Sequence, residues 1–168
     1  MHHTSLIAKE LNPSILYESF QTKPRNLAVR SKCKEPPNVA LVNAETREVI
    51  PWGVALGLVE HDYNPKELID HVVNYMGDAL IKCKINVNEH SGKIIKISMK
   101  ELKYTLGVWS QGASVELQVE IPEINYSESY TEIGNAYAGT PVAAAYAIHT
   151  VIWDIIKDPV IQDYMLCR

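Results

Sequence analysis

The chain has 168 residues and a formal net charge of -4, with acidic and basic residues mixed along its length. This size suits one domain with its own core, and the mixed charge leaves no basic stripe, which argues against nucleic acid or an anionic membrane as a partner. No apolar run reaches the roughly 18 to 20 residues that span a bilayer, and no signal-peptide pattern is present. We expect no cofactor and no metal.

Residues 1–25 are predicted to form an N-terminal arm or tether, and residues 26–168 a single α+β domain. The arm shows no sustained apolar period, and its opening histidine pair is typical of an expression tag, so a native signal or anchor ahead of Thr4 stays open. An apolar run at residues 38–43 indicates the first strand. Residues 45–57 are interpreted as a long connection.

The first predicted helix follows Asn64 and ends near Lys82. Asn64 is a good N-cap, Pro65 suits the first helical position, and Glu67 can return a hydrogen bond to the cap. Apolar residues then recur at the helical period and form one stripe: Leu68, Ile69, Val72, Val73, Met76 and Leu80. We expect this stripe to cover a sheet.

The stretch from Lys93 to Ile121 predicts a β-hairpin. Its second arm alternates strictly, with one apolar set facing inward: Val115, Leu117, Val119 and Ile121. The first arm changes phase, which predicts a bulge near Lys100 and Glu101. The turn is placed around residues 109–112, where Gly112 permits a positive φ.

A third strand is predicted at Ser129–Tyr137, with Gly134 at a bulge and one edge exposed to a partner. Thr140 with Pro141 is expected to start a mostly buried helix, and Asp158 to cap a last short one. The fold class is therefore α+β. We expect an antiparallel-rich sheet in the order strand, helix, three-strand meander, helix, with two helices packed on one face.

This order of elements, with the ending TPVAAAYAIHTVIWDIIKDPVIQDYM, resembles the YajG-like lipoproteins of Gram-negative outer membranes and related envelope accessory lipoproteins. Asp158 and the set Ile161, Tyr164 and Met165 stand where the family's closing pattern places them. The resemblance covers residues 38–165 and implies a non-enzymatic domain with no catalytic residues. The family's lipidated cysteine is not found in this chain.

Three residues suggest metal or acid-base chemistry. His61 and Asp62 stand next to Glu60, and His71 follows on the predicted helix. Imidazole and carboxylate groups can bind zinc, but no third ligand has a fixed spacing, and a solvated loop is the simpler interpretation. His149 is interpreted as a hydrogen-bonded core histidine. No motif for a serine or cysteine nucleophile is present.

Aromatic residues suggest a contact surface. Tyr126, Tyr130 and Tyr137 lie on or near the third strand, and Trp109 lies at the hairpin tip. Tyrosine and tryptophan are enriched at interfaces, although packing against their own sheet or shielding its edge is the more ordinary role. We interpret the four as candidate interaction residues.

The cysteines allow one disulfide in an oxidising compartment. Cys33 with Cys83 is the predicted pair, because a strand-helix-strand crossover returns the helix end towards the start of the first strand. Cys33 with Cys167 is the alternative.

Three functions remain open. The first is a periplasmic domain, anchored at the outer membrane by a lipid that this sequence lacks, that binds an envelope, secretion or motility protein or a second copy of itself. The second is a metal-dependent hydrolase that uses His61, Asp62 and His71. The third is a cytosolic scaffold or regulatory domain.

Overall fold

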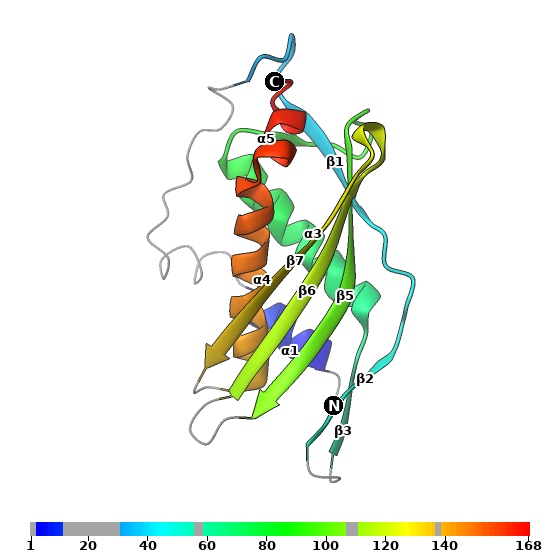
Figure 1. Ribbon diagram of the computed structural model, residues 1–168, viewed down its shortest axis with the longest axis vertical. Coiled ribbons are helices and arrows are strands. Elements are labelled where there is room, and N and C mark those ends of the chain that lie inside the picture. Colours follow the sequence, from blue (N-terminus) through cyan, green and yellow to red (C-terminus); the bar gives the residue numbers. More distant parts are fainter. Residues whose placement is uncertain (1–2, 12–30, 56–58, 107–110, 137–138) are drawn as a thin grey trace.

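The computed structural model describes residues 3–11, 31–55, 59–106, 111–136 and 139–168. Its elements in chain order are α1 (His3–Glu10), β1 (Asn38–Asn43), β2 (Ile50–Ala55), β3 (Val59–Tyr63), α3 (Pro65–Lys82), β4 (Asn86–Val87), β5 (Ile94–Leu106), β6 (Gln111–Ile121), the 3-10 turn η2 (Pro122–Ile124), β7 (Tyr126–Ala136), α4 (Thr140–Lys157) and α5 (Pro159–Met165). Figure 1 shows the long strands in one layer, with α3 and α4 in a second layer behind them. The fold is of mixed α+β class, as the sequence predicts.

The described strands form one main sheet and one small one. The main sheet has the spatial order β4-β1-β5-β6-β7. β5, β6 and β7 form an antiparallel meander, whereas β1 runs parallel to β4 and β5. Parallel neighbours need a crossover, and α3 supplies it. β2 and β3 pair apart from this sheet. Their hairpin, like β4, was not predicted from the sequence.

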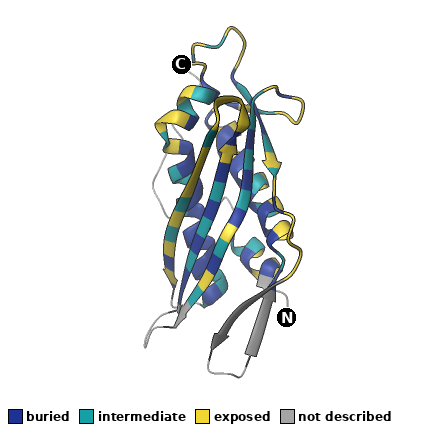
Figure 2. Cartoon of the chain, turned by 45° about the vertical axis from the view of Figure 1, so that its right-hand side comes forward, coloured by how far each residue is buried: buried dark blue, intermediate teal, exposed yellow. Residues whose placement is uncertain are grey.

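The core lies on the helical face of the main sheet. The predicted inward set on β6, Val115, Leu117, Val119 and Ile121, is fully buried, and Ile95 and Ile97 of β5 join it. Figure 2 shows buried and exposed bands alternating along these strands, as period-2 side chains require. α4 is mostly buried because alanines and isoleucines cover much of its surface.

The helix ends follow the sequence signals in two of three cases. Asn64 Oδ1 accepts the Glu67 N–H at 3.0 Å, so the predicted cap of α3 is confirmed. Asp158 Oδ1 likewise accepts two N–H groups of α5. The cap predicted at Thr140 is wrong: the cap position of α4 is Gly139, which has no side chain to offer, and Thr140 is a buried first helical residue.

The bulge in β5 is where the sequence predicts it, and a loop residue holds it. The pairing register of β5 and β6 shifts between Met99 and Glu101. Glu45, a buried residue, accepts the Met99 N–H at 3.1 Å through Oε2, and Arg47 Nη2 donates to the Met99 carbonyl. Burial raises the pKa of Glu45, but hydrogen bonds from Arg47 and Met99 outweigh it and leave the pKa below its usual value.

β7 differs from its predicted form at its first residue and in its register. It begins at Tyr126, because Asn125 takes a left-handed conformation (φ 51°) after η2 and turns the chain back at once. Gly134 pairs with Ala113 in unbroken register, so the bulge predicted at Gly134 is wrong.

The first part of the predicted arm contributes to the core. Ile7 of α1 and the following Leu11 belong to the buried cluster, and Thr4 Oγ1 accepts the Asn64 N–H at 2.8 Å. Residues 12–25 lie outside the described part of the chain, so the predicted boundary after residue 25 stays a prediction. Among the described residues no helix is both long and apolar enough to cross a membrane.

Candidate functional site

β7 is an edge strand of the main sheet. Within the described part of the chain it pairs with β6 alone, over its whole length of 11 residues. An edge strand presents backbone donors and acceptors that a further strand can use. Ile133 of this strand is 65% exposed, which is unusual for a large apolar side chain on a strand. Among the described strands, the predicted edge position of this strand is therefore confirmed.

Two of the predicted interaction residues lie together on β7. The hydroxyls of Tyr126 and Tyr130 are 2.6 Å apart, and both rings are half-buried against the core. Burial raises the pKa of Tyr130, and the Tyr126 hydroxyl and the Asp158 carboxylate raise it further. Burial is also the main cause of the raised pKa of Tyr126. Both phenols therefore keep their protons near neutral pH.

The sheet face opposite the helices is polar beside this edge. Gln118 of β6 donates to Ser127 Oγ and accepts from Ser129 Oγ, each at 2.8 Å. Lys100 Nζ donates to Ser129 Oγ at 2.7 Å and lies 3.4 Å from the Glu116 carboxylate. These contacts hold the open-face side chains of β7 in place next to the outer edge of the described sheet.

The helical side of the same edge is acidic. Burial raises the pKa of Glu132 on β7, and the neighbouring Asp154 carboxylate of α4 raises it further. Asp158 lies next to Tyr126 and Tyr130, and Glu128 of β7 is exposed. A basic side chain arriving along the edge would relieve the repulsion between Glu132 and Asp154.

The other two predicted interaction residues, Trp109 and Tyr137, lie outside the described residues, so their role stays a prediction.

The candidate metal-ligating residues of the alternative interpretation are described only in part. His61 and Asp62 fall on β3, where side chains lie outside the description, and His71 is half-buried on α3. In the described part of the chain no group of three or more His, Cys, Asp or Glu side chains is arranged to hold a metal ion. His149 is a buried core histidine, as predicted, with Nδ1 2.5 Å from the Tyr75 hydroxyl.

The disulfide joins Cys33 to Cys167, with 5.0 Å between their Cα atoms. The predicted pair Cys33–Cys83 is therefore wrong, and the alternative is formed. Cys83 caps the C-terminal end of α3 and is buried in the core, where burial raises the pKa of its thiol. α5 instead returns the chain end to the segment before β1, where Lys32 N–H donates to the Leu166 carbonyl at 2.8 Å (Figure 1).

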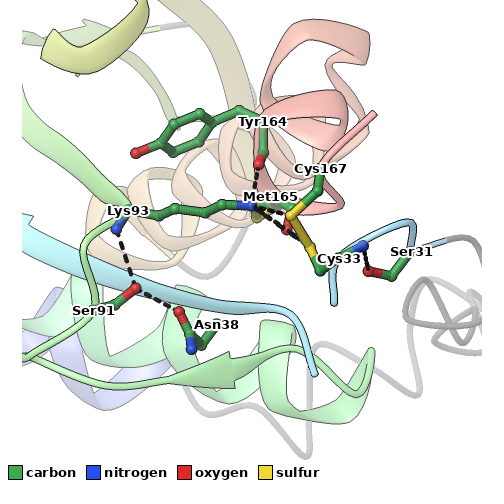
Figure 3. Close-up of a disulfide and its surroundings, with 8 residues drawn as sticks. All are labelled: Ser31, Cys33, Asn38, Ser91, Lys93, Tyr164, Met165 and Cys167. Carbon is green, nitrogen blue, oxygen red and sulfur yellow. Dashed lines mark hydrogen bonds between the residues drawn. A yellow bond between two sulfur atoms is a disulfide. The ribbon is translucent and has the colours of Figure 1, made fainter. Parts of the chain in front are cut away.

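A lysine lies beside this disulfide. Lys93 Nζ is 2.8 Å from Cys167 Sγ and 3.7 Å from Cys33 Sγ. It also donates to the carbonyl oxygens of Tyr164 and Met165, at 2.7 and 3.1 Å, at the end of α5 (Figure 3). The lysine beside this disulfide was not predicted from the sequence, because the contact joins residues more than 70 positions apart.

Comparisons with known proteins give information about the fold and none about the function. No protein-family model and no curated protein sequence matches the chain. The structure is similar to the hypothetical protein CT253 from Chlamydia trachomatis, with a TM-score of 0.52 and 11% identity over 80% of this chain and all of that one. A weaker likeness, with a TM-score of 0.39 and 12% identity, is to a dodecamer of PelC from Paraburkholderia phytofirmans, over 73% of this chain and 87% of that one. The chain therefore shares a two-layer α+β fold with CT253.

Proposed function

We propose that this chain is a non-enzymatic domain of the Gram-negative cell envelope, anchored at the outer membrane and facing the periplasm. Its task is to bind another envelope protein, through addition of a strand of that protein to the edge of β7. The observation that carries the proposal is the 11-residue edge of β7, which no other described strand pairs with on its outer side. Strand addition gives affinity through backbone hydrogen bonds and specificity through neighbouring side chains.

The side chains around the edge support a basic partner strand. Glu128 and Glu132 of β7 line its helical side, together with Asp154 of α4 and Asp158, the cap of α5. Lysine or arginine side chains at alternate positions of an added strand would face this row, and the complementary charges would favour one register. Ile133 offers the added strand an apolar contact on the other side of the edge.

The disulfide supports the proposed periplasmic location. Disulfides persist in the periplasm and are rare in the reducing cytosol. A bond between Cys33 and Cys167 is therefore expected of an envelope protein. The resemblance to YajG-like lipoproteins, with their order of strand, helix, three-strand meander and helix, agrees with the same location and remains part of the proposal.

Fractionation of cells that express the full-length gene tests the location. We expect the protein in the membrane fraction, released by detergent, with Cys33 and Cys167 protected from alkylation until a reductant is added. Recovery in the cytosol with three alkylatable thiols would contradict the proposal.

Co-purification of the partner tests whether the β7 edge is the binding surface. Ile133→Lys places a charge on the edge, which natural sheets use to prevent pairing. We expect this variant to lose the co-purifying partner while its thermal unfolding stays unchanged. Val49→Lys is the matched control, because Val49 is also 65% exposed but lies in the loop after β1. Equal recovery of the partner with both variants would exclude the β7 edge.

A further inference from the structure

The Cys33–Cys167 disulfide has a cation fixed beside it. Figure 3 shows the Lys93 side chain extended to the sulfurs, with its ammonium group also at the carbonyl oxygens of Tyr164 and Met165. The nearer sulfur is that of Cys167, at 2.8 Å, and that of Cys33 is at 3.7 Å. The positive charge therefore lies at the S–S bond and not out in solvent.

The surrounding structure holds the lysine in this place. Its backbone N–H donates to Ser91 Oγ at 3.2 Å, and Ser91 in turn donates to Asn38 Oδ1 at 2.6 Å. The next residue, Ile94, donates its N–H to the Tyr164 hydroxyl at 2.8 Å. Hydrogen bonds therefore hold Lys93 at both its backbone and its ammonium group, and keep the ammonium group beside the disulfide.

Several other charged residues lie near the disulfide, and Lys93 is the cation that contacts its sulfur atoms. Burial lowers the pKa of Lys93, and the carboxylate of Glu123, which accepts a hydrogen bond from the Tyr164 hydroxyl at 2.7 Å, offsets this lowering only in part. Arg168 lies beside Asp163, at 3.4 Å. The two lysines that flank Cys33, Lys32 and Lys34, are exposed and add positive charge. The carbonyl acceptors of α5 favour the ammonium form of Lys93.

A cation at this position favours opening of the disulfide. Each sulfur leaves as a thiolate, and thiols of lower pKa leave faster. An ammonium group in direct contact stabilises a thiolate and lowers the pKa of the corresponding thiol. Cys33, the sulfur that is attacked, is half-buried and Cys167 is exposed, so a reagent can reach the bond from solvent.

We propose that Cys33–Cys167 is an exchange-active disulfide that a protein dithiol reduces, with Lys93 stabilising the thiolate that leaves. A thiolate of the dithiol attacks Cys33 Sγ, the S–S bond breaks, and its electron pair goes to Cys167 Sγ beside Lys93. The second thiol of the dithiol loses its proton, attacks the mixed disulfide and releases Cys33. The dithiol is oxidised by two electrons to a disulfide, and the two cysteines take up its two protons.

Cys83 takes no part in this exchange. It is buried in the core, and burial raises the pKa of its thiol, so it stays protonated and inaccessible. The exchange site is also separate from the β7 edge, so its test does not depend on the proposed partner.

Reduction of the purified oxidised protein by dithiothreitol at pH 7 tests the proposal. Free thiols are counted by mass after quenching with a maleimide. We expect Lys93→Met to be reduced about threefold to tenfold more slowly than the wild type, because the departing thiolate loses its cation. Lys96→Met is the control, since it removes a lysine from β5 without touching the sulfurs, and it should react like the wild type. Lys93→Arg should restore most of the rate.

The pH profile of alkylation separates a charge effect from a merely structural one. In a Cys33→Ser background, the rate of Cys167 alkylation by iodoacetamide should reach half its maximum at least one pH unit below the value found with Lys93→Met added, because a contacting cation lowers a pKa by about 1 to 3 units. Circular dichroism of each variant checks that the fold is kept. Identical reduction rates and identical alkylation midpoints with and without the Lys93 charge would overturn the proposal.

Discussion

Gly134 of β7 lies directly against the backbone of Ala143 in α4. A Cβ atom built on Gly134 would be 1.9 Å from the Ala143 carbonyl oxygen and 2.9 Å from the Ala147 amide nitrogen. The edge strand and the helix therefore touch backbone to backbone, which only glycine on the strand and alanine on the helix allow. This contact keeps β7 in place at the edge of the sheet.

Gly134→Ala should destabilise the protein by about 3 kcal/mol or more, since neither backbone can move without disturbing the sheet or the core. Urea unfolding followed by circular dichroism measures the change. Gly92→Ala is the control, because a Cβ on Gly92 meets no atom within 4 Å. A loss below about 1 kcal/mol for Gly134→Ala would show that β7 and α4 are not packed this closely.

Glu45→Gln should destabilise the protein by about 2 to 3 kcal/mol, because the amide replaces one of the acceptor oxygens that hold Arg47 and Met99. Since the pKa of Glu45 is lowered in the folded state, its contribution is present above the usual carboxyl pKa and is lost as pH falls through the lowered value. Unfolding in urea at pH 7 and pH 3 should therefore show a smaller difference between variant and wild type at pH 3.

Glu101→Gln provides the comparison for that experiment. Glu101 forms an ion pair with Lys103 at 2.7 Å, but both side chains are substantially exposed. Such pairs contribute about 0 to 1 kcal/mol, so this variant should behave nearly like the wild type. Equal losses for both substitutions would exclude a special role for Glu45 at the bulge.

His149→Gln should weaken the dependence of stability on pH in mildly acidic solution. Burial, with a smaller contribution from the charge of Lys157, lowers the pKa of His149 to about 4. Between pH 6.5 and pH 4 the unfolded chain takes up a proton at this residue and the folded one does not, so the free energy of unfolding falls as pH drops. The change is on the order of 3 kcal/mol and should flatten below pH 4.

Urea titrations at several pH values between 7 and 4 measure this effect. Glutamine can still accept the Tyr75 hydroxyl bond, so the variant should fold while losing the titrating group. His90→Gln, at an exposed position in a turn, should leave the slope as it is. If the free energy of unfolding of His149→Gln changes with pH as steeply as that of the wild type, the pH dependence comes from other residues.

Local signals in the sequence predict the elements that carry them. Asn64 and Asp158 cap their helices because each is a good acceptor before a proline, and the phase change after Met99 locates the bulge. The edge position of β7 follows from its polar composition. Each of these features depends on residues only a few positions apart.

Contacts between distant residues explain what could not be predicted. The disulfide partner of Cys33 depends on where α5 returns the chain end, 134 positions later, and no pattern near Cys33 or Cys83 encodes it. Glu45 and Met99, which form the hydrogen bond at the bulge, are 54 positions apart in the sequence. Lys93 and Cys167, which are in contact beside the disulfide, are 74 positions apart. The parallel pairing of β1 with β4 was missed because β4 has only two residues.

The central claim is that the β7 edge is where an envelope partner binds, and site-specific photo-crosslinking in cells tests it most directly. A photoreactive phenylalanine analogue replaces Thr131, which is exposed on β7, or Lys103, which is exposed on β5 inside the sheet. The proposal predicts a crosslink from position 131 to an envelope protein with a basic extended segment, none from position 103, and loss of the crosslink when Ile133→Lys is added. No crosslink from position 131, or one that Ile133→Lys leaves unchanged, would contradict it.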